Sequence, residues 1–284
     1  MPGSGRRVFT CTKAAARAVA VSTAVAAAGF GHRVRYVEPY KPVLERVDIH
    51  VPDGINTPPR LRIGFVADTH IGPVIRPADV DRAMSCLLAA DPDLLLFGGD
   101  YVCESPRHIP DAAEVLGNYA SATRLGAVAV LGNHDYSNGA SKLTALFERR
   151  GIQVLRNEAT RVADSSGELW IAGIDDMMLG SPDPQQAFAS VQNDARALAL
   201  WHEPDWAEHM VPLGAFLQLS GHSHGGQVRL PVAGTIAAPA GGRRFVAGLS
   251  YVLGMPVYTT RGVGVYRPPV RFRCPSEVTL ITLV

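Results

Sequence analysis

From residue 61 onward, short apolar runs alternate with longer stretches of helical periodicity. We predict strands at five of these runs, residues 61–67, 94–97, 127–131, 197–201 and 216–219. Helices are expected between them, at residues 77–90, 111–120 and 141–150. Such alternation is typical of an α/β fold, because the helices cover the faces of the sheet that the strands build. The sequence therefore predicts an α/β domain.

Each of these apolar runs stops at a cluster of polar residues. The clusters are Asp68-Thr69-His70, Gly98-Gly99-Asp100, Gly132-Asn133-His134-Asp135, His202-Glu203-Pro204-Asp205 and Gly221-His222-Ser223-His224-Gly225-Gly226. In open α/β sheets the functional crevice lies outside the carboxyl ends of the strands. Five clusters at five such ends can therefore meet at one point, although they are far apart in the chain.

Taken singly, several of these clusters have an ordinary structural explanation. Asp68 and His70 form a short pattern that recurs by chance, and a lone histidine such as His202 is commonly a buried core residue. His222 and His224 are more specific, because alternate positions of an extended chain point the same way. The five clusters together, in this order, favour one shared site.

The donor atoms in these clusters are carboxylate and amide oxygens and imidazole nitrogens, without a thiolate. This mixture suits Mn²⁺, Fe, Zn²⁺ or Mg²⁺ and disfavours a soft-metal site. The four cysteines, Cys11, Cys86, Cys103 and Cys274, form neither a CxxC pair nor a zinc-finger spacing. We therefore expect thiols that are buried or inert, and no disulfide framework.

The overall charge excludes some classes of partner. Lysine and arginine number 27 and aspartate and glutamate 26, which gives a formal net charge of +1. A protein that coats nucleic acid needs a large basic field, so no nucleic-acid partner is expected. A nuclease would need a basic groove or an added domain, and the charge balance indicates neither. The apolar share of 47% is ample for a core and excludes intrinsic disorder.

Residues 1–31 form a separate segment. Arg6 and Arg7 precede an alanine-rich stretch that carries no charge over residues 18–31. As a helix this stretch would reach about 21 Å, short of a hydrocarbon core of about 30 Å, and its length suits the apolar region of a secretory signal. The paired arginines resemble a twin-arginine export signal. We therefore expect a signal or membrane-anchor helix and an exported or membrane-tethered protein, in the periplasm, the cell envelope or on the extracytoplasmic membrane face. A cytoplasmic protein with an N-terminal anchor is the alternative.

Residues 32–60 are expected to be a linker and a first strand. The segment is rich in proline, and a rough alternation over residues 43–51 ends at the turn signal Pro52-Asp53-Gly54. The catalytic domain would then span residues 61–284.

As a set, the motifs resemble the signature of the calcineurin-like metallophosphoesterase superfamily. The matching positions are Asp68-x-His70, Gly99-Asp100, Gly132-Asn133-His134-Asp135, His202 and Gly221-His222-x-His224. Residues 38–40, 202–205 and 260–277 are similar to a small single-domain bacterial branch with an N-terminal export signal or anchor. The resemblance implies a four-layer α/β fold, in which two packed mixed β-sheets are flanked by helices.

The resemblance also implies a centre of two divalent metal ions. Asp100 would bridge the ions, and the remaining ligands would be Asp68, His70 and His224 for one ion and Asn133, His202 and His222 for the other. A hydroxide shared by the ions would attack phosphorus in line. His134 would protonate or stabilise the leaving-group oxygen, and Asp135 would hold the His134 ring in the productive tautomer.

Departures from other branches narrow the expected activity. Protein Ser/Thr phosphatases carry Asp-Arg-Gly after Gly-Asp and end the third motif in glutamate, whereas Asp135 stands here. Purple acid phosphatases have a ligand tyrosine at the position of Cys103, and the best-known lipid A hydrolases replace the histidine that is His134 here. We expect a phosphodiesterase. A lipid-linked pyrophosphatase such as a UDP-diacylglucosamine hydrolase is the alternative. A non-catalytic interaction module is a third reading, but such modules lose ligands and none is lost here.

The sequence indicates the substrate less clearly than the metal ligands. Residues 71–75 and 231–254 are apolar and rich in glycine and proline, so both are expected to rim the site. Arg243 and Arg244 could clamp a second phosphate, although adjacent arginines are also typical of a solvated loop. An apolar rim suits an amphiphilic substrate, whereas ordinary loop packing explains the same pattern. A small-molecule or lipid-linked phosphoester and a monomeric protein are expected.

Overall fold

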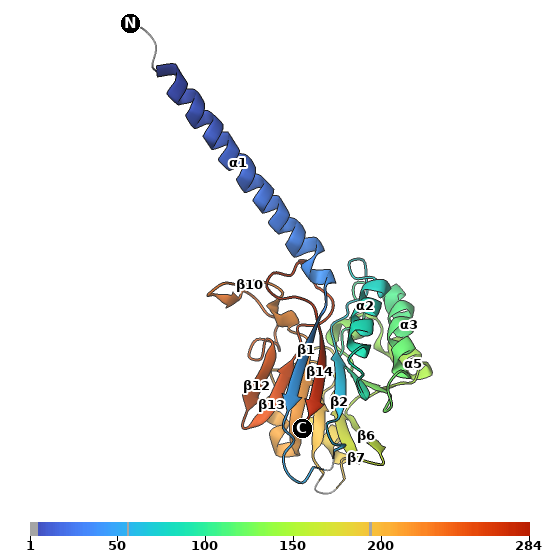
Figure 1. Ribbon diagram of the computed structural model, residues 1–284. Helices are drawn as coiled ribbons and strands as arrows, with labels where there is room; N and C mark the ends of the chain where they lie inside the picture. Colours follow the sequence, from blue (N-terminus) through green and yellow to red (C-terminus); the bar gives the residue numbers. More distant parts are fainter. Residues whose placement is uncertain (1–4, 56, 193–194) are drawn as a thin grey trace.

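Two six-stranded sheets form the centre of the molecule (Figure 1). The computed structural model describes residues 5–55, 57–192 and 195–284. In spatial order, the first sheet contains β1 (Val43–Ile49), β14 (Glu277–Leu283), β2 (Arg62–Val66), β3 (Leu94–Phe97), β4 (Ala127–Ala129) and β5 (Ile152–Val154). The second contains β12 (Gly248–Val252), β13 (Met255–Thr259), β9 (Ala215–Ser220), β8 (Ala197–Leu200), β7 (Gly167–Gly173) and β6 (Glu158–Asp164). Both sheets mix parallel and antiparallel pairs.

Helices cover the outer faces of both sheets. Helices α2 (Pro77–Leu88), α3 (Ile109–Ala120) and α5 (Ala140–Arg149) pack on the first sheet. Helix α6 (Pro184–Ala189) and the short 3₁₀ helices η3 (Ala207–His209) and η4 (Val211–Leu213) pack on the second. The predicted fold class, two packed mixed sheets flanked by helices, is thus confirmed. The remaining short elements are α4 (Asn133–Asn138), η1 (Glu38–Tyr40), η2 (Pro106–His108), η5 (His224–Gly226), and the hairpin of β10 (Arg229–Leu230) and β11 (Gly234–Thr235).

The core between the sheets follows from the pleat of the strands. Successive side chains of a strand point to opposite faces. Ile63 and Phe65 of β2 therefore face the second sheet, whereas Val66 belongs to the cluster under the helices. The inter-sheet cluster also includes residues of β3, β7, β8 and β9, among them Leu94, Leu96, Leu169, Ile171, Leu198, Leu200, Leu217 and Leu219.

The five apolar runs are found as β2, β3, β4, β8 and β9, and the three predicted helices as α2, α3 and α5. The alternation over residues 43–51 is β1, which pairs in parallel with the last strand, β14, over its whole length. Because β14 also pairs with β2, the segment before residue 61 is part of the first sheet rather than only a connection to it.

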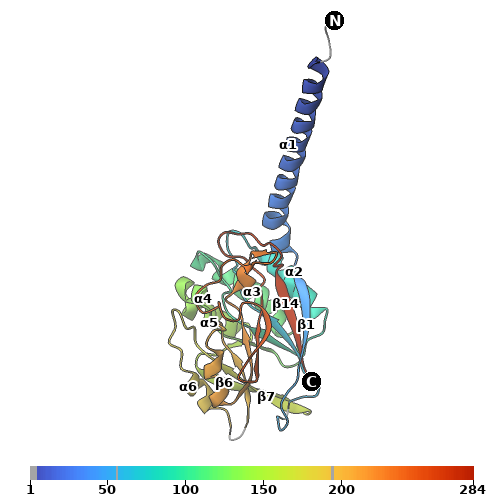
Figure 2. The same ribbon diagram turned by 90° about the vertical axis from the view of Figure 1, so that its left-hand side faces the viewer.

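Helix α1 (Gly5–Tyr36) projects from one end of the molecule (Figures 1 and 2). Its C-terminal end is held by the edge of the Phe30 ring against Phe272, with centroids 5.0 Å apart, and by the N–H of Arg271, which donates to the Val34 carbonyl at 3.0 Å. In the described part of the chain, no helix combines the length and the apolar character that crossing a membrane requires. A signal or anchor role for this segment stays a prediction.

Candidate metal centre

The carboxyl ends of β2, β3, β4, β8 and β9 meet at one edge of the two sheets, and the loops that follow carry the polar clusters. Asp68 and His70 follow β2, and Asp100 follows β3. Asn133 begins α4 after β4. His202 follows β8, and His222 and His224 follow β9. The first sheet therefore supplies four of the seven predicted ligands and the second sheet supplies three.

These side chains form two groups of donors. Asp68, His70 and His224 make one group, and Asp100, His202 and His222 make the other; within each group the candidate ligand atoms lie within 4.8 Å of one another. Asp100 Oδ2 lies 3.5 Å from His70 Nε2 and 3.2 Å from His202 Nε2. One carboxylate oxygen therefore stands between the two groups, where a ligand shared by two ions would have to be.

The hydrogen bonds around the second group leave lone pairs facing each other. His202 Nδ1 is 2.7 Å from the Gly98 carbonyl and His222 Nε2 is 2.8 Å from the Ala240 carbonyl, so these nitrogens are the donors. His202 Nε2 and His222 Nδ1 then face each other at 3.3 Å, and in the neutral rings that a metal ion would bind both are acceptors. The buried amide oxygen of Asn133 also has no donor. Several acceptors with no hydrogen between them fit a cation, and outer carbonyls that fix the tautomer are typical of histidine ligands.

Burial keeps three of the histidines neutral in the protein without a bound ion. It lowers the pKa of His70 to about 3 and that of His222 to about 4, and it lowers the pKa of His224 as well. Neutral imidazole is the form that binds metal, so these ligands need to lose no proton near pH 7.

The pKa values of the two carboxylates and of His202 are shifted in different directions. Burial raises the pKa of Asp68 to about 7. Burial alone would also raise the pKa of Asp100, but the charge and hydrogen bond of His202, together with the neighbouring histidines, outweigh it and hold this pKa well below its usual range. His202 correspondingly has a raised pKa, because Asp100 overcomes the effect of burial. A cation held by Asp100 and His202 would take the place of the proton that this raised pKa favours on His202 Nε2.

The backbone of the ligand loops is strained. The residues Asp68, His70, Asp100, His222 and His224 all have φ between +45° and +67°. Side-chain-bearing residues rarely adopt this left-handed region, which costs on the order of 1 kcal/mol each and is concentrated at functional sites. Gly99 has φ +96°, and a Cβ there would lie 2.7 Å from His202 Nδ1. Gly99 is therefore required for the approach of this ligand.

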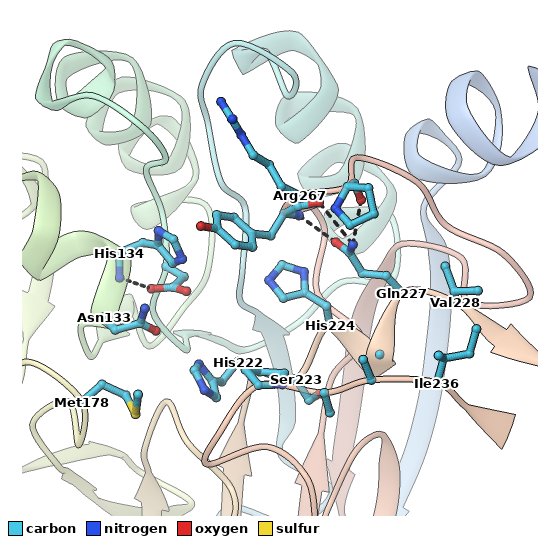
Figure 3. A pocket seen from close by; sticks show the side chains of 17 residues that line it. Asn133, His134, Met178, His222, Ser223, His224, Gln227, Val228, Ile236 and Arg267 are labelled. Carbon is cyan, nitrogen blue, oxygen red and sulfur yellow. Dashed lines mark hydrogen bonds between the residues drawn. The ribbon is translucent and has the colours of Figure 1, made fainter.

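His134 faces the cavity beside the donors (Figure 3). Its backbone N–H donates to Asp100 Oδ1 at 2.8 Å. Its ring lies edge-on to His70, with centroids 4.8 Å apart, and at the same distance from the ring of Tyr266. The imidazole is thus beside the predicted ligands and open to a substrate.

Asp135 is placed differently from our expectation. Its Oδ2 accepts the N–H groups of Asp100 at 2.8 Å and Gly132 at 2.9 Å, and its Oδ1 accepts that of Tyr101 at 2.8 Å. The contact that we predicted between this carboxylate and the His134 ring is absent from the described hydrogen bonds. Because Asp135 joins the loops that carry Asp100 and Asn133, it is a positioning residue for the ligands.

Sequence reasoning missed the role of Arg271, whose guanidinium is completely buried. It donates only to backbone carbonyls and to one thiol, and the carbonyl acceptors are Arg261 at 2.6 Å, Gly262 at 2.9 Å, Gly264 at 2.6 Å, Cys274 at 3.1 Å and His224 at 3.4 Å. The arginine ties the last ligand loop to the loop before β14. Its only sequence signal was its place in the tail that resembles the bacterial branch.

A cavity of about 670 Å³ opens at the donors (Figure 3). Of the two predicted rims, residues 236–239 line this cavity. In the other, Pro73 and Val74 line a smaller pocket beside His70, whereas Ile71 and Ile75 are buried in the core. Arg243 and Arg244 are absent from its described lining. Arg244 Nη1 is ion-paired with Glu208 at 2.6 Å, and Arg243 Nε donates to the Ala238 carbonyl at 3.2 Å. A phosphate clamp at this pair stays a prediction.

The cysteines do not add a disulfide in the described part of the chain. Cys86, Cys103 and Cys274 are free, and the latter two are buried. The side chain of Cys11 lies outside the described residues. Cys103 lies close enough to His70 and His134 for the three ligand atoms to fall within 4.8 Å of one another, so this thiol borders the candidate centre.

Comparison with known proteins gives a family match and several relatives of this chain. The family model for the calcineurin-like phosphoesterase matches residues 61–226. The phosphodiesterase YaeI of Escherichia coli is 34% identical over 269 residues, which cover 93% of this chain and 96% of the relative. The metallophosphoesterase YkuE of Bacillus subtilis is 30% identical over 272 residues, which cover 94% and 93%. Among solved structures, a phosphopantetheinyl hydrolase from Mycobacterium tuberculosis matches 74% of this chain and 92% of its own, with 11% identity and a TM-score of 0.47.

Proposed function

We propose that the metal centre of this chain, which belongs to the calcineurin-like phosphoesterase family, holds two divalent cations and hydrolyses phosphodiesters. Membership makes the chain a metal-dependent phosphoester hydrolase. The observation that supports two ions is the position of Asp100 Oδ2, within 3.5 Å of a histidine nitrogen from each donor group. The diester preference is supported by the phosphodiesterase relative.

The residues present fit two oxygen- and nitrogen-ligated ions. Asp68, His70 and His224 would hold one ion, and Asn133, His202 and His222 the other, with Asp100 shared. When bound, such cations lower the pKa of water and neutralise the charge of a phosphate group. Mn²⁺, Fe, Zn²⁺ and Mg²⁺ all accept this donor set, and the relatives do not discriminate among them.

In this proposal His134 supplies the proton of the leaving group. Its ring is beside the centre but outside both donor groups, so its nitrogens remain available to a substrate oxygen. A proton delivered there lets the leaving oxygen depart as an alcohol, which matters most for a poor leaving group. Asp135 and Arg271 act indirectly, because both hold the loops that present the ligands.

The test is turnover of a bis-aryl phosphodiester and of an aryl monoester by the full chain, after loading with Mn²⁺ and after treatment with chelator. We expect the metal-loaded protein to hydrolyse the diester faster and the chelated protein to hydrolyse neither. Asp100→Asn should lose bound metal and fall to the chelated rate, because the shared ligand is gone. Asp53→Asn, at an exposed turn, is the matched control.

Metal analysis of each variant accompanies the rates. Turnover that survives the chelator would contradict metal dependence. A metal-replete and fully active Asp100→Asn variant would contradict the shared-ligand role.

A further inference from the structure

The cavity at the metal centre has two chemically different walls. One wall is formed by the donors and His134. The other is formed by Val228, Ile236, Ala237, Pro239 and Tyr266, among others. The volume of about 670 Å³ lies in the range of roughly 300–1,000 Å³ that is typical of sites for drug-sized ligands. The cavity is therefore larger than a phosphate group requires.

Apart from the exposed Tyr266 hydroxyl, the polar side chains that border the second wall are already used within the protein. Gln227 Oε1 accepts the Tyr266 N–H at 2.7 Å, and its Nε2 donates to the carbonyls of Tyr266 and Pro268 at 3.2 and 3.1 Å. Ser223 Oγ donates to the Val246 carbonyl at 2.6 Å. Figure 3 shows the Gln227 amide turned toward its partners.

The one cationic side chain in this wall is also engaged. Arg267 forms a two-point ion pair with Glu104, at 3.1 and 3.0 Å. With the Tyr266 hydroxyl as the free side-chain partner in the described lining, a sugar or nucleotide placed along the wall would bury most of its hydroxyl or amide groups without partners. Each such group costs about 1–3 kcal/mol, so the wall selects against polar substituents.

The apolar surface continues from the cavity to the outside. Leu230, Val232 and Ile236 of the β10–β11 hairpin are exposed, and Ile236 belongs to both the hairpin region and the cavity. Val228 is bridged to Phe272, whose ring packs on Phe30 of α1. Figure 1 shows the hairpin at the end of the molecule from which α1 projects. Ile236 thus connects the cavity lining to the exposed apolar side chains of the hairpin, and exposed apolar surface next to a cavity is typical of a binding surface.

We propose that the substrate is an amphiphilic phosphoester, whose phosphate binds at the metal centre and whose alkyl or acyl chain lies along the apolar wall. The proposal rests on the phosphoesterase activity proposed above and specifies its substrate class. In the reaction, a water oxygen forms the new bond to phosphorus and the bond from phosphorus to the leaving oxygen breaks. One proton of the water goes to the leaving oxygen, which departs as an alcohol. The phosphate product keeps the water oxygen and the second proton, which can then ionise to solvent, so no redox partner is needed.

The test is a series of 4-nitrophenyl phosphodiesters whose second ester group is ethyl, butyl or octyl, assayed below their aggregation concentrations with the metal-loaded full chain. Release of 4-nitrophenol gives kcat/KM for each ester. Complete burial is worth about fourfold per methylene, so even partial burial predicts a rise of roughly tenfold to a hundredfold from ethyl to octyl.

Two variants then test whether the alkyl group of the substrate lies along the apolar wall. Ile236→Ser places a hydroxyl in the wall and should lower the octyl-to-ethyl ratio of kcat/KM by about fivefold or more. Leu249→Ser, the same change at an exposed residue of β12 that is absent from the described cavity lining, should leave the ratio as in the unmodified chain. Ile236 is itself 61% exposed, so its replacement is not expected to unfold the protein.

The outcomes separate the two proposals. If the ethyl ester is hydrolysed as well as the octyl ester, or if Leu249→Ser lowers the ratio as much as Ile236→Ser, the amphiphilic substrate class is wrong while the phosphodiesterase stands. If no ester is hydrolysed in the presence of metal, the proposed function itself fails, and this inference fails with it.

Discussion

At the scale of single residues, the metal centre is built from side chains held in uncommon backbone conformations. Asp68, His70 and Asp100 in the first sheet share a positive φ with His222 and His224 in the second. The surrounding hydrogen bonds hold them there: the His222 N–H donates to Asp68 at 3.0 Å, and Asp135 accepts the Asp100 N–H. The chain thus stores strain at the ligands, and the sheets on either side restrain it.

The proton donor can be tested through the leaving group. We expect His134→Gln to slow hydrolysis of an alkyl-leaving phosphodiester by about 10²–10⁴-fold, because a general acid is lost. A 4-nitrophenyl ester, whose leaving group needs no proton, should slow far less. The measurement is kcat for both esters at equal metal content. Equal slowing of the two esters, or a variant without metal, would show that His134 has another role.

At the scale of elements, Arg271 is the clearest case of a residue that shapes the site from outside it. Its buried guanidinium holds the carbonyls of the loop before β14 and the His224 carbonyl together. Hydrogen bonds from a charged group are worth about 1.5–3 kcal/mol each, so Arg271→Met should lower the free energy of unfolding by at least about 3 kcal/mol.

Denaturant unfolding of the metal-free protein measures this loss. Arg273→Met, two residues later and exposed, is the matched control and should change stability by less than about 0.5 kcal/mol. A similar loss in both variants would show that the guanidinium bonds do not support the loop.

The five strands that were predicted from apolar runs share one property, which the missed strand β14 lacks. Continuous apolar runs such as residues 94–97 identify strands that are buried on both faces. β14 is as buried as these, yet it carries Glu277 and Thr279, so its pattern suggests a half-exposed strand. These polar groups are satisfied inside, because Glu277 pairs with Arg261 at 2.9 Å and accepts the Tyr258 hydroxyl at 2.7 Å. The periodicity of a short segment cannot reveal hydrogen-bond and ion-pair partners that come from other parts of the chain.

Some features of the candidate site could also be predicted from the sequence and others could not. The ligand positions follow from motifs at strand ends, since parallel strands bring their carboxyl ends together. The role of Asp135 does not follow, because adjacency to His134 in the chain suggests a contact that the short helix α4 prevents by turning the two side chains apart. The apolar wall depends on the hairpin, and the hairpin contains only short strands without a clear pattern.

At the scale of the whole molecule, the two sheets share the metal centre, so bound ions should stabilise the fold. A ligand at one hundred times its Kd adds about 2.7 kcal/mol, which predicts that Mn²⁺ raises Tm by roughly 5–10 °C at pH 7.5. Below pH 7 the gain should shrink. Burial raises the pKa of Asp68 to about 7, so this carboxyl is protonated there and must release its proton to bind a cation.

Each unit of pH below 7 should weaken binding about tenfold through this group. Thermal unfolding with and without Mn²⁺ between pH 7.5 and 5.5 measures the effect, and chelated protein is the reference at each pH. A gain in Tm that is constant over this range would show that Asp68 is already ionised without a cation.

The division of the ligands between the sheets has a consequence for residues far from any ligand. Leu198, Leu217 and Phe65 lie in the cluster that fixes how one sheet sits on the other. A shortened side chain there changes the relative alignment of the layers, and with it the spacing of donors that arrive from both sides. The turnover rate should therefore respond to changes in the packing between the sheets. A core substitution that is too mild to unfold the protein would still lower this rate.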